Sequence, residues 1–191
     1  MTCAAGRRAA HKALEATLKN ARQLAEPEKL ALKIAECHEK AGRADKAAEG
    51  YKKLAESGGN PAVCGEARVR WARLLENAGK IDEAIAQYET AVKSASGDPA
   101  ARAAFRLGEL YASKEQWEPA AKAFMRVAVL YLHETLSPAA LWQAGVCFEK
   151  LGRTEDAAGA WTELVRDFPN APEAAQAREA LQRLSPQGGG S

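Results

Sequence analysis

Apolar residues recur along most of the chain at steps of three and four residues, the spacing that gathers them on one face of an α-helix. The first such stretch covers residues 7–25, where Leu14, Leu18, Ala21 and Leu24 follow this spacing. Few segments show the alternation of apolar and polar residues that is typical of β-strands. Alanine is abundant beside leucine, glutamate, lysine, arginine and glutamine, which all favour helices. The pattern predicts an all-α protein.

Glycine and proline divide the helical pattern into pairs of helices. Pro27 ends the first stretch, and a short turn separates the two helices of each later pair. The expected pairs are 28–41 with 44–57, 62–78 with 81–95, 100–113 with 116–134, and 139–151 with 154–168. A further helix at 173–184 precedes residues 186–191, a glycine-rich tail that we expect to be disordered.

Three columns of residues repeat along these pairs with one common spacing of 37, 36 and 37 residues. The first column holds the small residues Ala35, Ala72, Gly108 and Gly145 of the first helices. The second holds Ala47, Ala84, Ala120 and Ala157, and the third holds the aromatic residues Tyr51, Tyr88, Phe124 and Trp161 of the second helices. Because the abundance of alanine cannot explain the aromatic column, the spacing indicates four copies of one helical hairpin.

These columns resemble the tetratricopeptide repeat family, and in particular its bacterial members. The family's unit has a small residue midway through the first helix and an aromatic residue three positions later. An alanine in the second helix, an aromatic residue four positions further on and a proline near the end complete it. The fourth unit matches at Gly145, Phe148, Ala157, Trp161 and Pro169. The period of 36–37 exceeds the family's usual 34 residues, so we expect long loops or second helices, most clearly at 116–134.

The resemblance implies a right-handed α-solenoid of about four helix-turn-helix repeats, in which stacked hairpins share one core. Ala10 and Leu14 lie 37 residues before Ala47 and Tyr51, so the first helix is either half a repeat or a cap. The expected organisation is an N-terminal helix at 1–27, repeats at 28–61, 62–99, 100–138 and 139–172 within 28–172, a C-terminal capping helix at 173–185, and a disordered tail at 186–191.

The charge of the chain is nearly balanced, with 27 basic and 25 acidic residues and a net charge of +2. This balance gives no reason to expect a nucleic-acid partner. No apolar stretch approaches the roughly 20 residues needed to cross a bilayer, so membrane insertion is not expected. The N-terminus lacks the apolar run of a signal peptide. The expected location is the cytoplasm, or the periplasm if a signal segment has been removed.

The sequence contains no motif typical of an enzyme or a metal site. It has no nucleophile elbow, no glycine-rich phosphate loop and no closely spaced set of metal ligands. We therefore expect no catalytic residue, cofactor or metal. The cysteines are too far apart in sequence for a zinc site and are expected to be free, mostly packed thiols. They are Cys3, Cys37, Cys64 and Cys147, and the scattered histidines are His11, His38 and His133.

The resemblance also implies that the first helices line a concave groove that binds a peptide or protein. One apolar column on this expected surface comprises Leu32, Val69, Phe105 and Trp142. It either packs between neighbouring first helices or binds side chains of a peptide. Beside it lie Arg70, Arg73, Arg102 and Arg106, which are either a solvated face or a site for the carboxylates of an acidic partner.

The predicted function is a non-catalytic protein–protein interaction module, a scaffold or adaptor that binds a peptide or protein segment in the groove. The alternative is a structural subunit that self-assembles into a homo-oligomer through stacked repeat ends. Neither hypothesis involves an enzyme activity.

Overall fold

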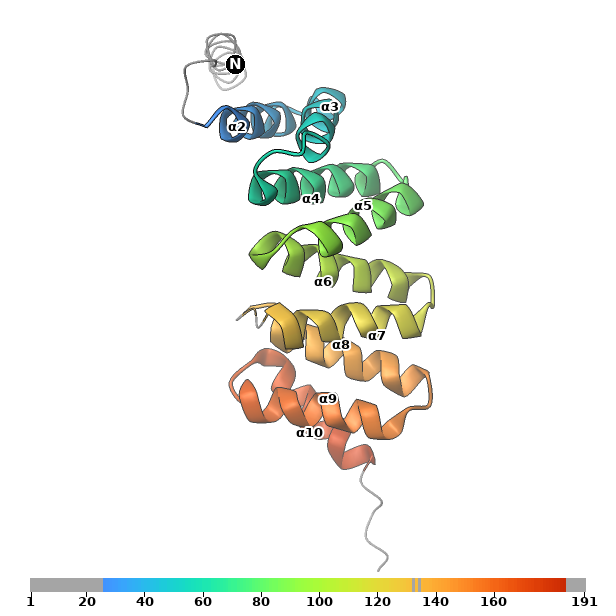
Figure 1. The fold of residues 1–191 in the computed structure, drawn as a ribbon. Coiled ribbons are helices and arrows are strands. Elements are labelled where there is room, and N and C mark those ends of the chain that lie inside the picture. Colours follow the sequence, from blue (N-terminus) through green and yellow to red (C-terminus); the bar gives the residue numbers. More distant parts are fainter. Residues whose placement is uncertain (1–25, 132, 134, 185–191) are drawn as a thin grey trace, which may run out of the picture. The chain divides into compact units, whose positions relative to one another are not determined.

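The computed structural model describes residues 26–131, 133 and 135–184, and this part of the chain is all-α (Figure 1). Each helix expected between 28 and 184 is present with ends within three residues of those expected, except the one at 116–134. The helix expected at 7–25 and the tail at 186–191 lie outside the described residues. The elements are α2 (Pro27–Lys40), α3 (Ala44–Ala55), α4 (Pro61–Asn77), α5 (Ile81–Ser94), α6 (Gly97–Ser113), α7 (Trp117–Arg126), the π-helix η2 (Val127–Tyr131), α8 (Ser137–Lys150), α9 (Thr154–Asp167) and α10 (Pro172–Leu184).

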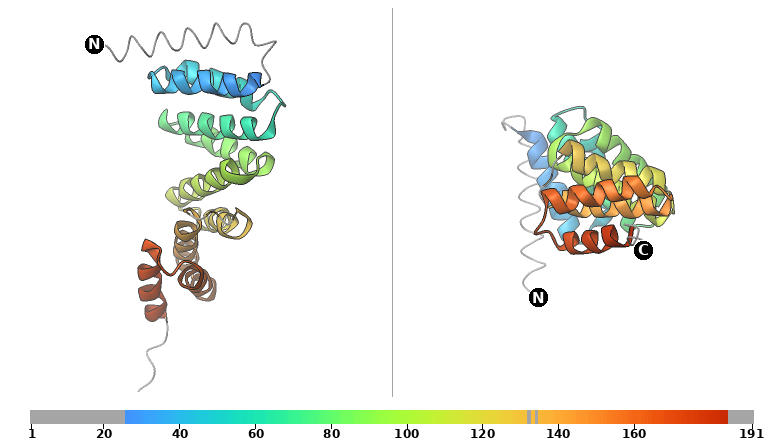
Figure 2. Two further views of the ribbon diagram at one scale, coloured as in Figure 1. Left: turned by 90° about the vertical axis from the view of Figure 1, so that its left-hand side faces the viewer. Right: turned by 90° about the horizontal axis from the view of Figure 1, so that it is seen from below.

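The chain divides into two compact units, with the boundary between Ala100 and Ala101 in the first turn of α6. In the N-terminal unit, α2 packs on α3, α3 on α4 and α4 on α5. In the C-terminal unit, α7 packs on α8, α8 on α9 and α9 on α10, as the views in Figures 1 and 2 show. Each unit is therefore a row of helices in which neighbours in sequence are neighbours in space, as expected of stacked hairpins.

Prolines stand at the start of several helices. The N–H groups of the first turn have no partner within the helix, so a proline, which lacks an N–H, loses no hydrogen bond there. Pro27, Pro61 and Pro138 occupy the first or second position of α2, α4 and α8. Before α4, the Asn60 side chain accepts hydrogen bonds from the backbone N–H groups of Ala62 and Val63, at 3.0 and 3.3 Å. The prolines, together with the Asn60 cap, thus fix the residue at which the next helix begins.

The turn inside each hairpin contains one residue in the left-handed conformation. Gly42, Gly79 and Gly152 take this position with φ of 72°, 76° and 71°. In the third hairpin the position belongs to Glu115, with φ of 57°. The turn itself is the same, since the N–H of the next residue, Gln116, donates to the carbonyl five residues earlier at 2.9 Å. Glu115 therefore carries backbone strain that the three glycines avoid.

We expect Glu115→Gly to raise the free energy of unfolding by about 1 kcal/mol, because glycine adopts this conformation without steric cost. Urea denaturation followed by circular dichroism measures the effect. The matched control is Gly152→Ala, where an added Cβ meets no atom within 4 Å, so any loss of stability comes from the backbone alone. A Glu115→Gly variant that is less stable than the parent would contradict the assignment of strain.

The helix expected to run from 116 to 134 is continuous as far as Tyr131 but changes type in its second half. An α-helix ends at Arg126, and the chain continues as the π-helix η2. A π-helix is wider than an α-helix and accommodates an extra residue per turn. Val127 and Ala128 remain buried, whereas Val129 and Leu130 are 55% and 62% exposed. The second helix of this repeat thus continues to Tyr131 with a local change of helix type.

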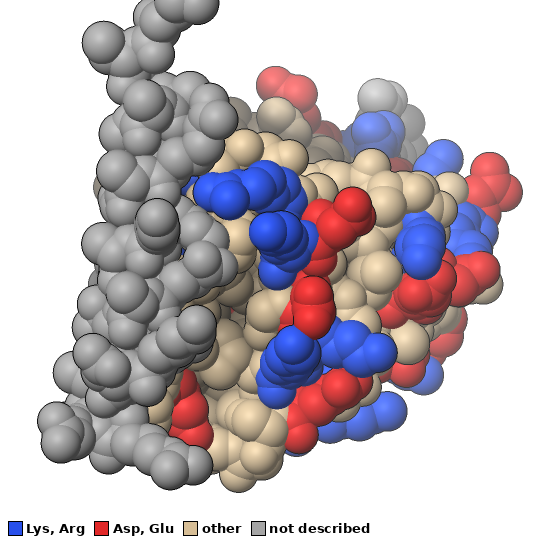
Figure 3. Space-filling view, turned by 90° about the horizontal axis from the view of Figure 1, so that it is seen from above, with Lys and Arg blue, Asp and Glu red and all other residues tan. Residues whose placement is uncertain are grey.

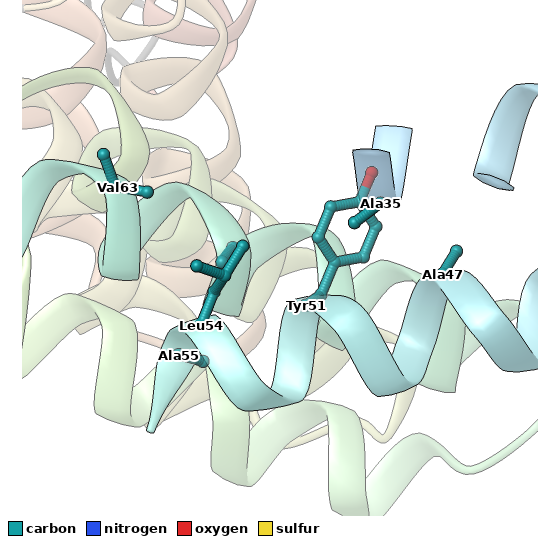
Figure 4. Close-up of a cluster of buried hydrophobic side chains, with 7 residues drawn as sticks. Ala35, Ala47, Tyr51, Leu54, Ala55 and Val63 are labelled. Carbon is teal, nitrogen blue, oxygen red and sulfur yellow. The ribbon is translucent and has the colours of Figure 1, made fainter. Parts of the chain in front are cut away.

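The aromatic column forms the core, as the repeat pattern predicts. Tyr51, Tyr88, Phe124 and Trp161 are all at most 2% exposed. Figure 4 shows Tyr51 of α3 projecting toward Ala35, the small residue of the first helix in the same hairpin. In the third and fourth hairpins the small residue is Gly108 or Gly145, where an added Cβ would lie only 2.7 or 2.2 Å from the aromatic ring. The close approach of the two helices of a hairpin therefore depends on the small-residue column.

Candidate functional site

Two arginines predicted to face a partner, Arg70 and Arg73, project from α4 into a group of carboxylates. Arg70 forms ion pairs with Glu66 at 2.6 Å, Glu36 at 3.3 Å and Glu39 at 3.7 Å, and its side chain is 26% exposed. Arg73 pairs with the other oxygen of Glu39 and is 52% exposed. The positive charge of both arginines is therefore already compensated within the N-terminal unit.

This ion-pair network continues into the core through Tyr51, whose hydroxyl donates to Glu39 Oε2 at 2.6 Å. Burial alone would raise the pKa of Glu39, but the hydrogen bonds from Tyr51 and Arg73 and the charges of Arg73 and Arg70 lower it below its usual value. Burial, reinforced by Glu39, raises the pKa of Tyr51. Because the lowered pKa of Glu39 favours its charged form in the folded state, the network stabilises the fold at neutral pH. That contribution is lost as the pH falls below about 4.5 and through the lowered pKa.

The apolar column in the N-terminal unit is only partly accessible. Leu32 is partly buried and packs against the cluster that contains Ala35 and Tyr51. Val69 is 8% exposed and belongs to the core. Leu32 thus retains some surface for a partner, whereas Val69 offers little.

In the C-terminal unit the column consists of two aromatic residues that each lie against the core aromatic of their own hairpin. Phe105 contacts Phe124 edge to face, with ring centroids 5.5 Å apart. Trp142 stacks on Trp161 at the same distance with an interplanar angle of 27°, and its carbonyl accepts a hydrogen bond from Trp161 Nε1 at 3.3 Å. Phe105 and Trp142 remain partly exposed although their partners are buried. Both rings are therefore held in place and still accessible.

The remaining predicted arginines, Arg102 and Arg106, lie on α6 in the C-terminal unit, whereas Arg70 and Arg73 belong to the N-terminal unit. Arg106 pairs with Glu109 on the same helix at 2.6 Å and is 44% exposed. Arg102 is partly buried. Arg106 is thus the more accessible guanidinium of this pair.

The sequence analysis did not identify the carboxylates that pair with these arginines. Glu66 and Arg70 are four residues apart on α4, a spacing that by itself favours an ion pair. Four acid–arginine pairs join a hairpin to the element that follows it, with a separation of 34 or 35 residues, slightly less than the repeat. They are Glu36–Arg70, Glu39–Arg73, Glu118–Arg153 and Glu149–Arg183. A search for acid–arginine pairs at this separation would have found them.

The described part of the chain has charges of both signs on its surface and three free thiols. Basic and acidic side chains are interspersed on the face in Figure 3. Within residues 26–184 as described, no three histidine, cysteine or acidic residues could hold a metal ion, and no helix is long and apolar enough to cross a membrane. Cys37, Cys64 and Cys147 are free thiols, and burial raises the pKa of Cys147 to about 11, so it stays protonated at neutral pH. Cys3 and His11 lie outside the described residues.

Several solved structures share the arrangement of helices. BtubC (BKLC) from P. vanneervenii is similar with a TM-score of 0.64 and 19% identity, covering 97% of this chain and 78% of that one. A tetratricopeptide repeat protein from Parabacteroides merdae has a TM-score of 0.61 and 17% identity over 93% of this chain and 66% of its own. MamA from Desulfovibrio magneticus has a TM-score of 0.56 and 17% identity over 82% and 92%. At these identities the similarity shows the fold alone.

Family models give the same result from the sequence. No curated protein matches the chain significantly. One model described as a tetratricopeptide repeat matches residues 69–140, and a second model with that description matches residues 30–57 and 139–171. These ranges contain the small and aromatic columns of the four hairpins. The chain belongs to the tetratricopeptide repeat family.

Proposed function

We propose that this protein is a non-catalytic scaffold or adaptor that binds a peptide or protein segment on the first helices of its repeats, α2, α4, α6 and α8. Tetratricopeptide repeats form a typical protein-interaction fold. The observation that carries the proposal is the accessible ring of Trp142, which stacks on the fully buried Trp161. Trp142 packs against the core around Trp161 and keeps part of its surface for a partner.

The stacking of Trp142 and Phe105 also favours binding energetically. A side chain that is already ordered loses little conformational freedom when a partner covers it, so more of the apolar contact contributes to affinity. Trp142 is ordered by Trp161, and Phe105 is ordered by Phe124. Aromatic residues in such positions commonly dominate the energy of an interface. In the N-terminal unit, Leu32 offers a separate apolar surface, and Val69 lies in the core.

The arginines indicate the chemistry of the partner around its apolar anchor. A guanidinium has five N–H donors, so one that pairs with a single carboxylate retains donors for another. Arg73 and Arg106 are the exposed members of their pairs, at 52% and 44%. Arg70 and Arg102 are less exposed and offer less surface to a partner. We therefore propose an apolar segment flanked by carboxylates as the partner.

The first test introduces a photo-crosslinking amino acid in place of Phe105. The control places it at Thr162, an exposed position on the second helix α9. A protein crosslinked at position 105 and not at position 162, identified by mass spectrometry, would supply the partner for affinity measurements.

With that partner, we expect Trp142→Ala to weaken binding by at least about tenfold, the effect typical of removing a central aromatic residue. The matched control is Leu151→Ala, a large exposed apolar residue in the turn between α8 and α9. Arg106→Glu should also weaken binding, and the loss of affinity should be larger at low salt than at high salt. Isothermal titration calorimetry measures all three variants. Equal affinity of the Trp142→Ala and Leu151→Ala proteins would exclude the proposed face.

A further inference from the structure

Helices α2 and α3 line an open hollow of about 440 Å³ on the N-terminal unit. Ala31 and Ile34 of α2 and Leu54 of α3 provide an apolar lining. Lys46 and Lys53 of α3 contribute charged side chains to its edge. An apolar hollow with a charged edge is the kind of surface that accepts one side of an amphipathic helix.

The corresponding surface of the next hairpin is covered by a helix. There α3, the second helix of the preceding hairpin, packs on α4, and Leu54 and Ala55 share a cluster with Trp71. Arg68 of α4 donates to the Ala55 carbonyl at 2.5 Å and to Gln87 Oε1 of α5 at 2.9 Å. If the repeat extends one step toward the N-terminus, a helix that precedes α2 would cover the α2–α3 surface as α3 covers α4.

Side-chain size explains why the α2–α3 surface is hollow. The residues 37 positions before Arg68 and Gln87 are Ala31 and Gly50. Both line the hollow, so two small residues stand where the next hairpin has two long side chains. A helix that covers this surface must therefore fill it with apolar side chains larger than Ala55, the residue of α3 that packs on α4.

We propose that residues 7–25 of the same chain occupy this hollow with the face that carries Leu14, Leu18, Ala21 and Leu24. The segment is close at hand, because the described structure begins at Glu26 and α2 at Pro27. Leu18 lies 37 residues before Ala55, so it holds the position in this segment that Ala55 holds in α3. The repeat therefore places a leucine opposite the small residues Ala31 and Gly50. The polar residues Lys12 and Lys19 fall on the opposite face of a helix with this stripe.

This occupant would close the N-terminal end of the repeats with the chain's own sequence. A second copy of the chain would then find no apolar surface there, which argues against end-to-end assembly through α2 and α3. The inference is independent of the aromatic part of the proposed partner-binding face, since Phe105 and Trp142 lie on α6 and α8 in the other unit.

The test is disulfide formation in the full-length chain between Leu18→Cys and Ala31→Cys, with Cys3, Cys37 and Cys64 replaced by serine. The matched control pairs Ala31→Cys with Lys19→Cys, one residue away on the opposite face. We expect Leu18→Cys to form an intramolecular disulfide at least about tenfold faster than Lys19→Cys, because docking raises the local thiol concentration. Equal rates would overturn the proposal. Mixing light and isotopically heavy chains gives the second criterion: disulfides that join the two would show that another copy occupies the hollow, which would also overturn it.

A second experiment does not use cysteine. Ala31→Asp places a carboxylate in the apolar hollow, where a docked helix would cover it. We expect it to speed tryptic cleavage after Lys12, Lys19 and Arg22 by about tenfold, since burying the charge disfavours docking and the protease cuts the undocked segment. Ala86→Asp, an exposed substitution on α5, is the control and should leave the rate unchanged. Unchanged cleavage in the Ala31→Asp protein would contradict the proposal.

Discussion

Trp161→Ala is expected to lower the free energy of unfolding by about 3–5 kcal/mol, the cost of removing a large aromatic side chain from a packed core. Trp161 is fully buried and belongs to a cluster with Leu141, Leu164 and Ala177, so the deletion leaves a cavity that three helices line. The indole also stacks on Trp142 and donates to its carbonyl, and both contacts are lost.

Urea denaturation followed by far-ultraviolet circular dichroism measures this loss. Trp142→Ala removes the same side chain from a partly exposed position and should cost clearly less, which separates burial from residue type. Because the chain has two compact units, the transition should be fitted with each unit allowed to unfold separately. A loss of less than about 1 kcal/mol for Trp161→Ala would mean that the core of α8 and α9 does not depend on this ring.

Gly145→Ala is expected to destabilise the protein by about 1–3 kcal/mol or more, although it adds only one methyl group. The new Cβ would lie 2.2 Å from Trp161 Nε1 and 2.5 Å from Cε2, far inside contact distance, and the indole is rigid. Either α8 must move away from α9 or the ring must leave its position. Thermal and urea denaturation both report the change.

Gly159→Ala is the matched control for Gly145→Ala, because its added Cβ meets no atom within 4 Å. This glycine lies inside α9, so the substitution should stabilise the helix by about 0.5–1 kcal/mol. Combining Gly145→Ala with Trp161→Tyr reproduces the Ala72 and Tyr88 pair of the second hairpin and should recover part of the lost stability. If Gly145→Ala were as harmless as Gly159→Ala, the close approach of the two helices would not constrain position 145.

Much of the fold could be predicted from the sequence because the same packing residues recur in each of the four hairpins. The aromatic column was recognisable at Trp161, and the structure confirms that it is core. The π-helix η2 could not be predicted, since the residues at 127–131 suit either kind of helix. Which one forms depends on how α7 and α8 pack, because that packing keeps Val127 buried.

The candidate site was less predictable, because a side chain's surroundings depend on residues in the neighbouring hairpin. The column of Leu32, Val69, Phe105 and Trp142 is uniform in sequence, yet only Val69 is in the core. Arg70 and Arg73 are conspicuous in sequence, but the carboxylates around them come mainly from α2. Those acids are found only when consecutive hairpins are compared at the separation of 34 residues, because neither hairpin taken alone indicates the pairing.

The acid–arginine pairs between consecutive hairpins have a consequence for the evolution and engineering of the chain. The hairpins share the same small and aromatic columns, so their cores alone would let one replace another. The pairs Glu39–Arg73, Glu118–Arg153 and Glu149–Arg183 each need the acid in one hairpin and the arginine in the element that follows. Deleting or exchanging a hairpin would leave these charges beside the wrong neighbour. The hairpins therefore have similar cores but are not interchangeable, because each of these ion pairs forms only when the two elements follow one another in their present order.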